Sequence, residues 1–209
     1  MIKIKVCGLT ERNNIKQVVK TGIDAAGFIL AESPRKVSLK KVKKLTRGIP
    51  PFISKIGVVV NPGQEKLKKI VKSNLFDYLQ FHGTEKTELI NLSPLNNIKA
   101  VSISQKKDLN LLKDYDQVDY FLFDAKNEKK RGGTGEKFNW NYLQELEINK
   151  PFILAGGLGP NNIEKAIKEV QPEAVDLNSQ IEIKPGIKDI KLLKKTINII
   201  RKYENQLNK

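Results

Sequence analysis

The stretch that decides the fold is residues 53–72, which read ISKIGVVVNPGQEKLKKIVK. Residues 53–60 are dominated by β-branched apolar side chains, which is typical of a buried strand. Asn-Pro-Gly at 61–63 ends that strand, and in residues 64–72 apolar side chains recur at helical spacing between lysines. The stretch is therefore one complete strand-then-helix unit, the building block of parallel sheets.

The same unit recurs along the whole chain. The expected strands are residues 2–6, 25–30, 53–60, 76–81, 98–103, 120–123, 152–154 and 174–177. The expected helices are 10–20, capped by Thr10, then 38–47, 64–72, one capped by Thr84, 108–115, 140–147, 160–170 and 187–206.

Eight such units in 209 residues give about 26 residues per unit, which fits a (β/α)₈ barrel. A doubly wound open sheet is the alternative, but no G-x-G-x-x-G follows the first strand. No insertion is long enough for a second domain. We therefore predict an α/β protein with one domain, residues 1–209, folded as a single (β/α)₈ TIM barrel.

The composition excludes several classes of protein. One cysteine and one histidine exclude a disulfide framework and a site built from several Cys or His ligands, so no metal is expected. No apolar run approaches the roughly 18 residues that span a bilayer. The N-terminal lysines interrupt any signal-peptide core. We expect a cytoplasmic protein with no membrane partner.

The net charge of +15 is typical of nucleic-acid-binding proteins. The lysines are nevertheless spread along amphipathic stretches, such as 36–44, 66–72 and 188–195, and aromatic residues make up only 7%. This pattern favours solvated helix faces, and we expect no nucleic-acid partner. A nucleic-acid-binding protein is kept as the alternative from another class, and a third reading is a field that attracts a small anionic substrate.

In a barrel of this kind the active site lies where the strands end at their carboxyl side. The polar or glycine residues at those positions are Cys7, Arg35, Asn61, His82, Ser102, Asp124, Gly156, Gly157, Asn178 and Ser179. A thiol and a carboxyl on two different strands can act as a general base and a general acid. Gly156 and Gly157 follow the seventh strand, where this fold often binds phosphate through backbone N–H groups.

Several short motifs, in a fixed order, give the chain a family resemblance. They are KVCGLT at 5–10, SPR at 33–35, GVVVN at 57–61, LQFHG at 79–83, GGTG at 132–135, AGGL at 155–158, VDLNS at 175–179 and PGIKD at 185–189. In this order they resemble the phosphoribosylanthranilate isomerase family of tryptophan biosynthesis. The resemblance covers nearly the whole chain and implies a (β/α)₈ barrel that rearranges a phosphorylated small-molecule substrate without a cofactor.

The resemblance also implies roles for individual residues. Asp124 would protonate the furanose ring oxygen as general acid, and Cys7 would remove the proton from sugar C2 as general base. Arg35 would hold the anthranilate carboxylate, and Asp176 would contact sugar hydroxyls. The phosphate would be bound by Gly156, Gly157, Asn178 and Ser179. Whether the enzyme is a monomer or a homodimer is left open.

Three positions depart from the family pattern: Gln180 replaces a usual glycine, Glu136 a lysine and Asn139 an aspartate. We expect Gln180 to cost about 1 kcal/mol, or to reshape the phosphate loop, if that glycine has a positive φ. The polar loop 125–137 is expected to close over the substrate as a lid. His82 is interpreted as structural. The histidine-pathway isomerase, with an aspartate where this chain has Cys7, is the nearest rival.

Overall fold

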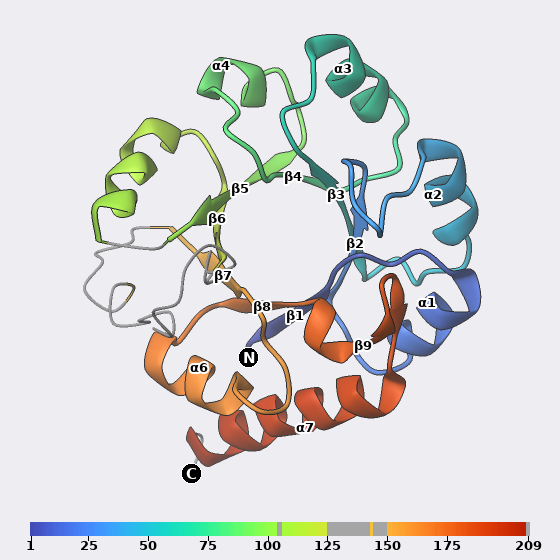
Figure 1. Ribbon diagram of the computed structural model, residues 1–209, viewed down its shortest axis with the longest axis vertical. Coiled ribbons are helices and arrows are strands. Elements are labelled where there is room, and N and C mark those ends of the chain that lie inside the picture. Colours follow the sequence, from blue (N-terminus) through green and yellow to red (C-terminus); the bar gives the residue numbers. More distant parts are fainter. Residues whose placement is uncertain (104–105, 125–142, 144–149, 208–209) are drawn as a thin grey trace.

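Eight parallel strands form a closed barrel in the computed structural model, which describes residues 1–103, 106–124, 143 and 150–207 (Figure 1). The strands are β1 (Lys3–Val6), β2 (Ala25–Ile29), β3 (Ser54–Val59), β4 (Tyr78–Phe81), β5 (Asn96–Ser102), β6 (Tyr120–Asp124), β7 (Phe152–Ala155) and β8 (Ala174–Leu177). The first and last strands close the ring, with Lys5 opposite Asp176. The predicted (β/α)₈ barrel is confirmed.

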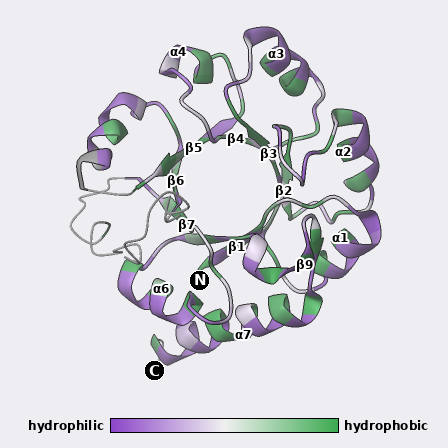
Figure 2. Cartoon of the chain, in the orientation of Figure 1, coloured by the Kyte–Doolittle hydropathy of each residue, from purple (hydrophilic) through white to green (hydrophobic). Residues whose placement is uncertain are grey.

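Helices surround the barrel (Figure 1). They are α1 (Arg12–Val19), α2 (Leu39–Leu45), α3 (Gln64–Lys72), α4 (Thr87–Ile90), the 3₁₀ helix η1 (Lys106–Tyr115), α6 (Ile163–Val170) and α7 (Ile190–Leu207). Each carries both hydrophobic and hydrophilic residues (Figure 2), and most of the apolar ones are buried, Leu111 and Leu207 being exposed. The main core therefore lies between the strands and this outer layer of helices.

A smaller apolar cluster fills the inside of the barrel. It consists of Ile56, Ile98, Ala100, Leu122, Ile153 and Ala155. Because successive side chains on a strand point to opposite faces, the residues between these ones face the helices instead. The interior of the barrel is thus filled by side chains, and a ligand is expected at its end.

The sequence placed most elements well but misplaced two helix caps. Ser38, the predicted start of the second helix, caps α2 through a 3.2 Å bond from Lys41 N to its Oγ. Helix α1 is capped by Glu11, which accepts from Asn13 N and Asn14 N, and not by Thr10. Helix α4 begins at Thr87, three residues after the predicted cap Thr84. A longer acidic side chain reaches two backbone N–H groups at once, which a threonine hydroxyl cannot do.

The segment after β8 contains an antiparallel hairpin that the sequence did not predict. Strand β9 (Glu182–Lys184) pairs with β10 (Ile187–Lys188) after the 3₁₀ helix η2 (Ser179–Ile181), so α7 begins at Ile190 and not at 187. Asn14 on α1 fixes the hairpin through two bonds to the Lys188 backbone, both 2.8 Å. The hairpin is thus part of the wall around the end of the barrel.

Two sequence predictions fall outside the described residues. These are the lid at 125–137, with its GGTG motif, and the helix at 140–147 apart from the buried Leu143.

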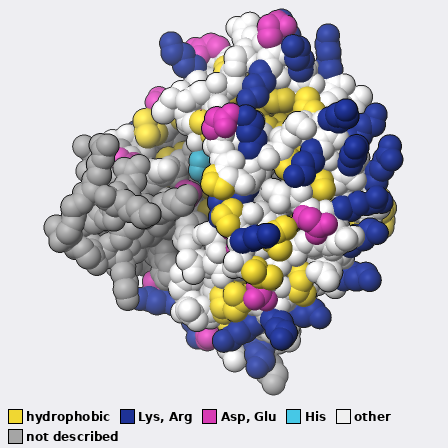
Figure 3. Space-filling model, turned by 45° about the vertical axis from the view of Figure 1, so that its right-hand side comes forward, with side chains coloured by type: hydrophobic (Ala, Val, Ile, Leu, Met, Phe, Trp, Pro, Cys, Tyr) yellow, Lys and Arg dark blue, Asp and Glu magenta, His cyan; other side chains and the backbone are white. Residues whose placement is uncertain are grey.

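The lysines of α2, α3 and α7 are exposed, and Figure 3 shows Lys and Arg side chains dispersed over the surface with Asp and Glu between them. This is the distribution expected of solvated helix faces. Of the helices that the structure describes, none has the length and apolar character needed to cross a membrane.

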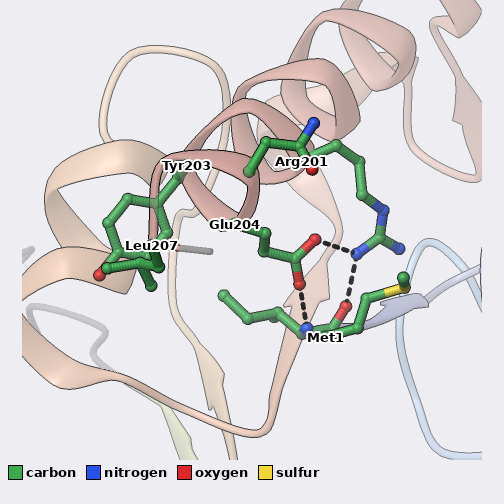
Figure 4. A pocket seen from close by; sticks show the side chains of 7 residues that line it. Met1, Arg201, Tyr203, Glu204 and Leu207 are labelled. Carbon is green, nitrogen blue, oxygen red and sulfur yellow. Dashed lines mark hydrogen bonds and ion pairs between the residues drawn. The ribbon is translucent and has the colours of Figure 1, made fainter. Parts of the chain in front are cut away.

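The two ends of the chain are joined by a small polar clamp (Figure 4). Glu204 on α7 accepts from Ile2 N and from Arg201 Nη1, and Arg201 Nη1 also donates to Ile2 O at 2.9 Å. The clamp holds the start of β1 against the closing helix.

Candidate active site

A cavity of about 290 Å³ lies at the carboxyl ends of the strands. All eight residues proposed from the sequence line it: Cys7, Arg35, Asp124, Gly156, Gly157, Asp176, Asn178 and Ser179. His82, Gln80 and Ser33 line it as well. Side chains that are up to 172 positions apart in the chain therefore meet in one place because parallel strands end at the same edge of the barrel.

Cys7 lies just past β1, buried against two charged neighbours. Its backbone N donates to Leu177 O at 2.9 Å, which ties it to β8. Lys5 Nζ lies 2.6 Å from Asp176 Oδ2, and this ion pair is almost completely buried. Asp176 Oδ1 is buried and has no hydrogen-bond partner among the described residues. An oxygen of this kind at a cavity wall is a site for a ligand hydroxyl.

Burial raises the pKa of the Cys7 thiol above its ordinary value, and the Asp176 carboxylate raises it further. The positive charges of Lys5 and Lys188 oppose this rise. The thiolate of Cys7 is therefore a stronger base than that of an exposed cysteine, but it forms only at a higher pH.

Asp124 ends β6 and faces a histidine. His82 Nε2 lies 3.5 Å from Asp124 Oδ2, and Gln80 Nε2 lies 2.9 Å from His82 Nδ1. The contact with Gln80 fixes the orientation of the imidazole, so that its other nitrogen points toward the carboxyl. Sequence reasoning interpreted His82 as structural. The spacing of Gln80 and His82, two apart at a strand end, was the available signal that both face the cavity.

Arg35 lines the cavity, but much of its guanidinium is engaged. Its Nε and Nη2 donate to the Glu182 carboxylate of β9, at 2.9 and 2.5 Å. Glu182 also accepts from Lys188 Nζ at 2.8 Å, and the same ammonium donates to Asn178 Oδ1 at 2.8 Å. One buried network thus joins Arg35 to Asn178. Sequence reasoning missed Glu182 and Lys188, although Lys188 belongs to the PGIKD motif.

Gly8 makes this arrangement possible. Its φ is +76°, and a Cβ there would lie 2.6 Å from Arg35 Cδ and 3.0 Å from Asn178 Oδ1. Any side chain at position 8 would therefore collide with the Arg35 side chain and strain the backbone.

The candidate phosphate loops contact each other. Gly156 and Gly157 have φ of +99° and +64°, which glycine adopts without strain. A Cβ on Gly159 would lie 2.7 Å from Gln180 Cβ. The non-glycine residues with positive φ in the described chain are Asn61, Asn74 and Gln171, so Gln180 carries no such strain. The expected cost at Gln180 is therefore absent.

Among the described residues, no group of three or more His, Cys, Asp and Glu side chains is arranged to hold a metal ion. The cavity instead offers a thiol at one strand end and a carboxyl three strands further around the ring. Arg35 adds a cation to its lining, and Lys188 is a second, buried cation that contacts the lining residue Asn178. Such a site can move protons on an anionic ligand.

The comparisons with known proteins point to one family. The family model described as N-(5′-phosphoribosyl)anthranilate (PRA) isomerase matches residues 4–199. A relative of that name from Petrotoga mobilis is 54% identical over 201 residues, covering 96% of this chain and 97% of its own.

Solved structures give the same result. Phosphoribosyl anthranilate isomerase from Thermotoga maritima is 32% identical with a TM-score of 0.88, covering 97% of this chain and all of its own. A second such isomerase, in complex with reduced 1-(o-carboxyphenylamino)-1-deoxyribulose 5-phosphate, is 30% identical with a TM-score of 0.83 over the same shares.

Proposed function

Because the chain belongs to the family of N-(5′-phosphoribosyl)anthranilate isomerases of tryptophan biosynthesis, we propose that Cys7 and Asp124 perform the two proton transfers of this aldose-to-ketose isomerisation. The observation that carries the proposal is the single cavity lined by both residues and by all six of the other candidate site residues. Each proton transfer contributes on the order of 10²–10⁴ in rate.

Asp124 acts first, as the general acid. Its proton goes to the furanose ring oxygen, the bond between that oxygen and C1 breaks, and the nitrogen lone pair forms an iminium with C1. His82, 3.5 Å from Oδ2, keeps the carboxyl aimed into the cavity. A carboxyl held at the end of β6 supplies the proton without rearrangement of the backbone.

Cys7 then acts as the general base. The thiolate removes the proton from C2, and the electron pair of that C–H bond neutralises the iminium, which gives an enolamine. Tautomerisation of the enolamine yields the ketose. C2 is oxidised while C1 is reduced within one molecule, so the reaction balances without an external redox partner or a cofactor.

The two ends of the substrate are anionic, and the cavity offers a group for each. Arg35 retains the N–H groups that Glu182 does not use, and these suit the anthranilate carboxylate. Asp176 Oδ1 accepts from a sugar hydroxyl. The phosphate is bound by the backbone of Gly156 and Gly157 together with Asn178 and Ser179.

The test is loss of the fluorescent anthranilate adduct when the substrate is mixed with purified protein. Wild type should consume it, and Cys7→Ala should be at least about 10²-fold slower. Equal rates in the two proteins would refute the assigned base. A titration with salt addresses the nucleic-acid alternative, since polyanion binding falls by orders of magnitude between low and physiological salt. Whether the protein is a monomer or a homodimer stays open, and sedimentation of the purified protein would decide it.

A further inference from the structure

Lys5 and Cys7 share one face of the first strand. Ile4 and Val6 belong to the core beneath the helices, so the alternation of side chains places Lys5 and Cys7 on the inner face of the barrel. Asp176 is the direct neighbour of Lys5 on β8. The three side chains therefore form a polar cluster at the cavity, which Cys7 and Asp176 line.

The Lys5 ammonium acts on two groups. It donates to Asp176 Oδ2 at 2.6 Å, and its positive charge acts on the Cys7 thiol, two residues further along on the same face. Only 2% of Lys5 and 9% of Asp176 are exposed, so solvent screens the three groups weakly. The second oxygen of Asp176 is unpartnered among the described residues, and Asp176 lines the cavity.

We propose that Lys5 is a positioning residue whose ammonium is shared between Asp176 and the Cys7 sulfur, and that a substrate hydroxyl on Asp176 Oδ1 shifts this shared charge toward the sulfur. The inference rests on the proposed function in one respect, because it takes Cys7 as the base. Substrate binding then activates the base, and an empty site holds a largely protonated thiol.

The charges around Cys7 determine in which direction each substitution should shift the pKa of its thiol. Besides Lys5 and Asp176, the charged groups that act on Cys7 are Lys188 of β10 and Arg35 after β2. After burial, Lys5 has the largest influence on the pKa of Cys7, larger than the opposing influence of Asp176. Removal of the cation should therefore raise the pKa of Cys7, and removal of the carboxylate charge should lower it.

Because Cys7 is the only cysteine, the pH dependence of alkylation by iodoacetamide reports on this thiol alone. Lys5→Met should raise the apparent pKa of Cys7 by at least one unit, with alkylation about tenfold slower at pH 7. Lys5→Arg should stay close to wild type. Asp176→Asn should lower the pKa, and the Lys5→Met/Asp176→Asn double variant should lie between Lys5→Met and wild type.

Lys99 provides a matched control. It is as buried as Lys5 and pairs with Glu85 at 2.7 Å, but it faces the helices and lies on β5. Lys99→Met loses the same kind of buried ion pair, so any general loosening should appear in it as well. Its alkylation profile should match that of wild type.

The activation step has its own kinetic readout. The acid limb of kcat/KM reports the free enzyme, and that of kcat reports the bound enzyme. In wild type the limb of kcat should lie at a lower pH than that of kcat/KM, and in Asp176→Asn the two should coincide.

An unchanged alkylation profile in a folded Lys5→Met variant would overturn the proposal. If that variant does not fold, Asp176→Asn decides the matter, and a pKa of Cys7 equal to or above that of wild type overturns it. Alkylation needs no substrate, so full activity of Cys7→Ala would refute the proposed function without affecting this measurement.

Discussion

His82 Nε2 and Asp124 Oδ2 lie 3.5 Å apart, and Gln80 holds the other nitrogen of the same ring at 2.9 Å. The histidine therefore holds a fixed position beside the carboxyl that we assign as the acid. His82→Asn should lower kcat about tenfold, equivalent to about 1.4 kcal/mol, with KM within twofold, because it loses one polar contact that orients Asp124. Steady-state kinetics measure both constants. An unchanged kcat would support the purely structural interpretation of His82 made from the sequence.

Asp124→Asn should abolish most turnover and leave the barrel intact. The amide is nearly isosteric but has no transferable proton, so we expect kcat to fall at least about 10²-fold. Thermal unfolding should show a midpoint close to that of wild type. Ser102 of β5, which pairs in register with Asp124 of β6, gives a control, and Ser102→Ala should retain activity. Substantial turnover by Asp124→Asn would mean that another group protonates the ring oxygen.

The pH dependence of the wild type should follow the thiol. A base must be deprotonated, so kcat/KM rises with pH through the pKa of Cys7. Burial and Asp176 raise that pKa, so the rise should continue above the roughly 8.5 of an ordinary cysteine. Initial rates of fluorescence loss across pH 6 to about 10 measure the limb. A plateau already reached at about pH 7 would contradict the raised pKa.

Glu182→Gln should destabilise the protein in a pH-dependent way. Burial alone would raise the pKa of Glu182, but hydrogen bonds from Arg35 and Lys188 lower it below its ordinary value. Its contribution to stability is therefore present above the unfolded-state pKa of about 4.3 and is lost as pH falls through the lower folded value. Near pH 7, removal of the charge should cost on the order of 3 kcal/mol.

The measurement is urea unfolding of both proteins at several pH values. The difference in unfolding free energy should shrink from about pH 5 to about pH 3. Glu65→Gln is the control, because the Glu65–Lys68 pair is largely exposed and contributes little. KM should also rise in Glu182→Gln, since Arg35 loses the carboxylate that orients it. A difference in unfolding free energy that does not change with pH would contradict the lowered pKa of Glu182.

Gly159→Ala should weaken phosphate binding because the added methyl group meets Gln180 Cβ at 2.7 Å. We expect KM to rise severalfold, and Gln180→Gly in the same chain to restore it by removing the collision. Gly63→Ala is a control, since nothing lies within 4 Å of a Cβ there. Simple additivity of the two substitutions would show that the loops do not meet at this point.

The sequence predicted those features that depend on hydrophobic periodicity or on position at the end of a strand. The apolar runs and their stops located all eight strands. Position at a strand end made Cys7 and Asp124 candidates, and the family resemblance assigned their roles. Lys5 was passed over as one of the lysines of the first strand, because alternation shows that two residues share a face without showing which face. Cys7, two positions further on, lies on the same face, and its proposed role in the site could have shown that this face is the inner one.

Glu182 was missed for a different reason. Strands β9 and β10 have three and two residues, too short to produce a hydrophobic period. Their formation depends on contacts far away in the chain, such as Asn14 with Lys188. The partners of Arg35 are likewise tertiary, so no local pattern could show that Glu182 holds its guanidinium.

The pairing of β1 with β8 also has a consequence for how the protein is made. Lys5 and Asp176 are 171 positions apart, so their contact forms only when the final strand joins the first. A nascent or truncated chain that ends before Ala174 contains the sulfur, yet it lacks the carboxylate and the hairpin that set its charge environment. The reactivity of the thiol is therefore acquired together with the completed ring, and completion of the chain becomes the step that switches the chemistry on.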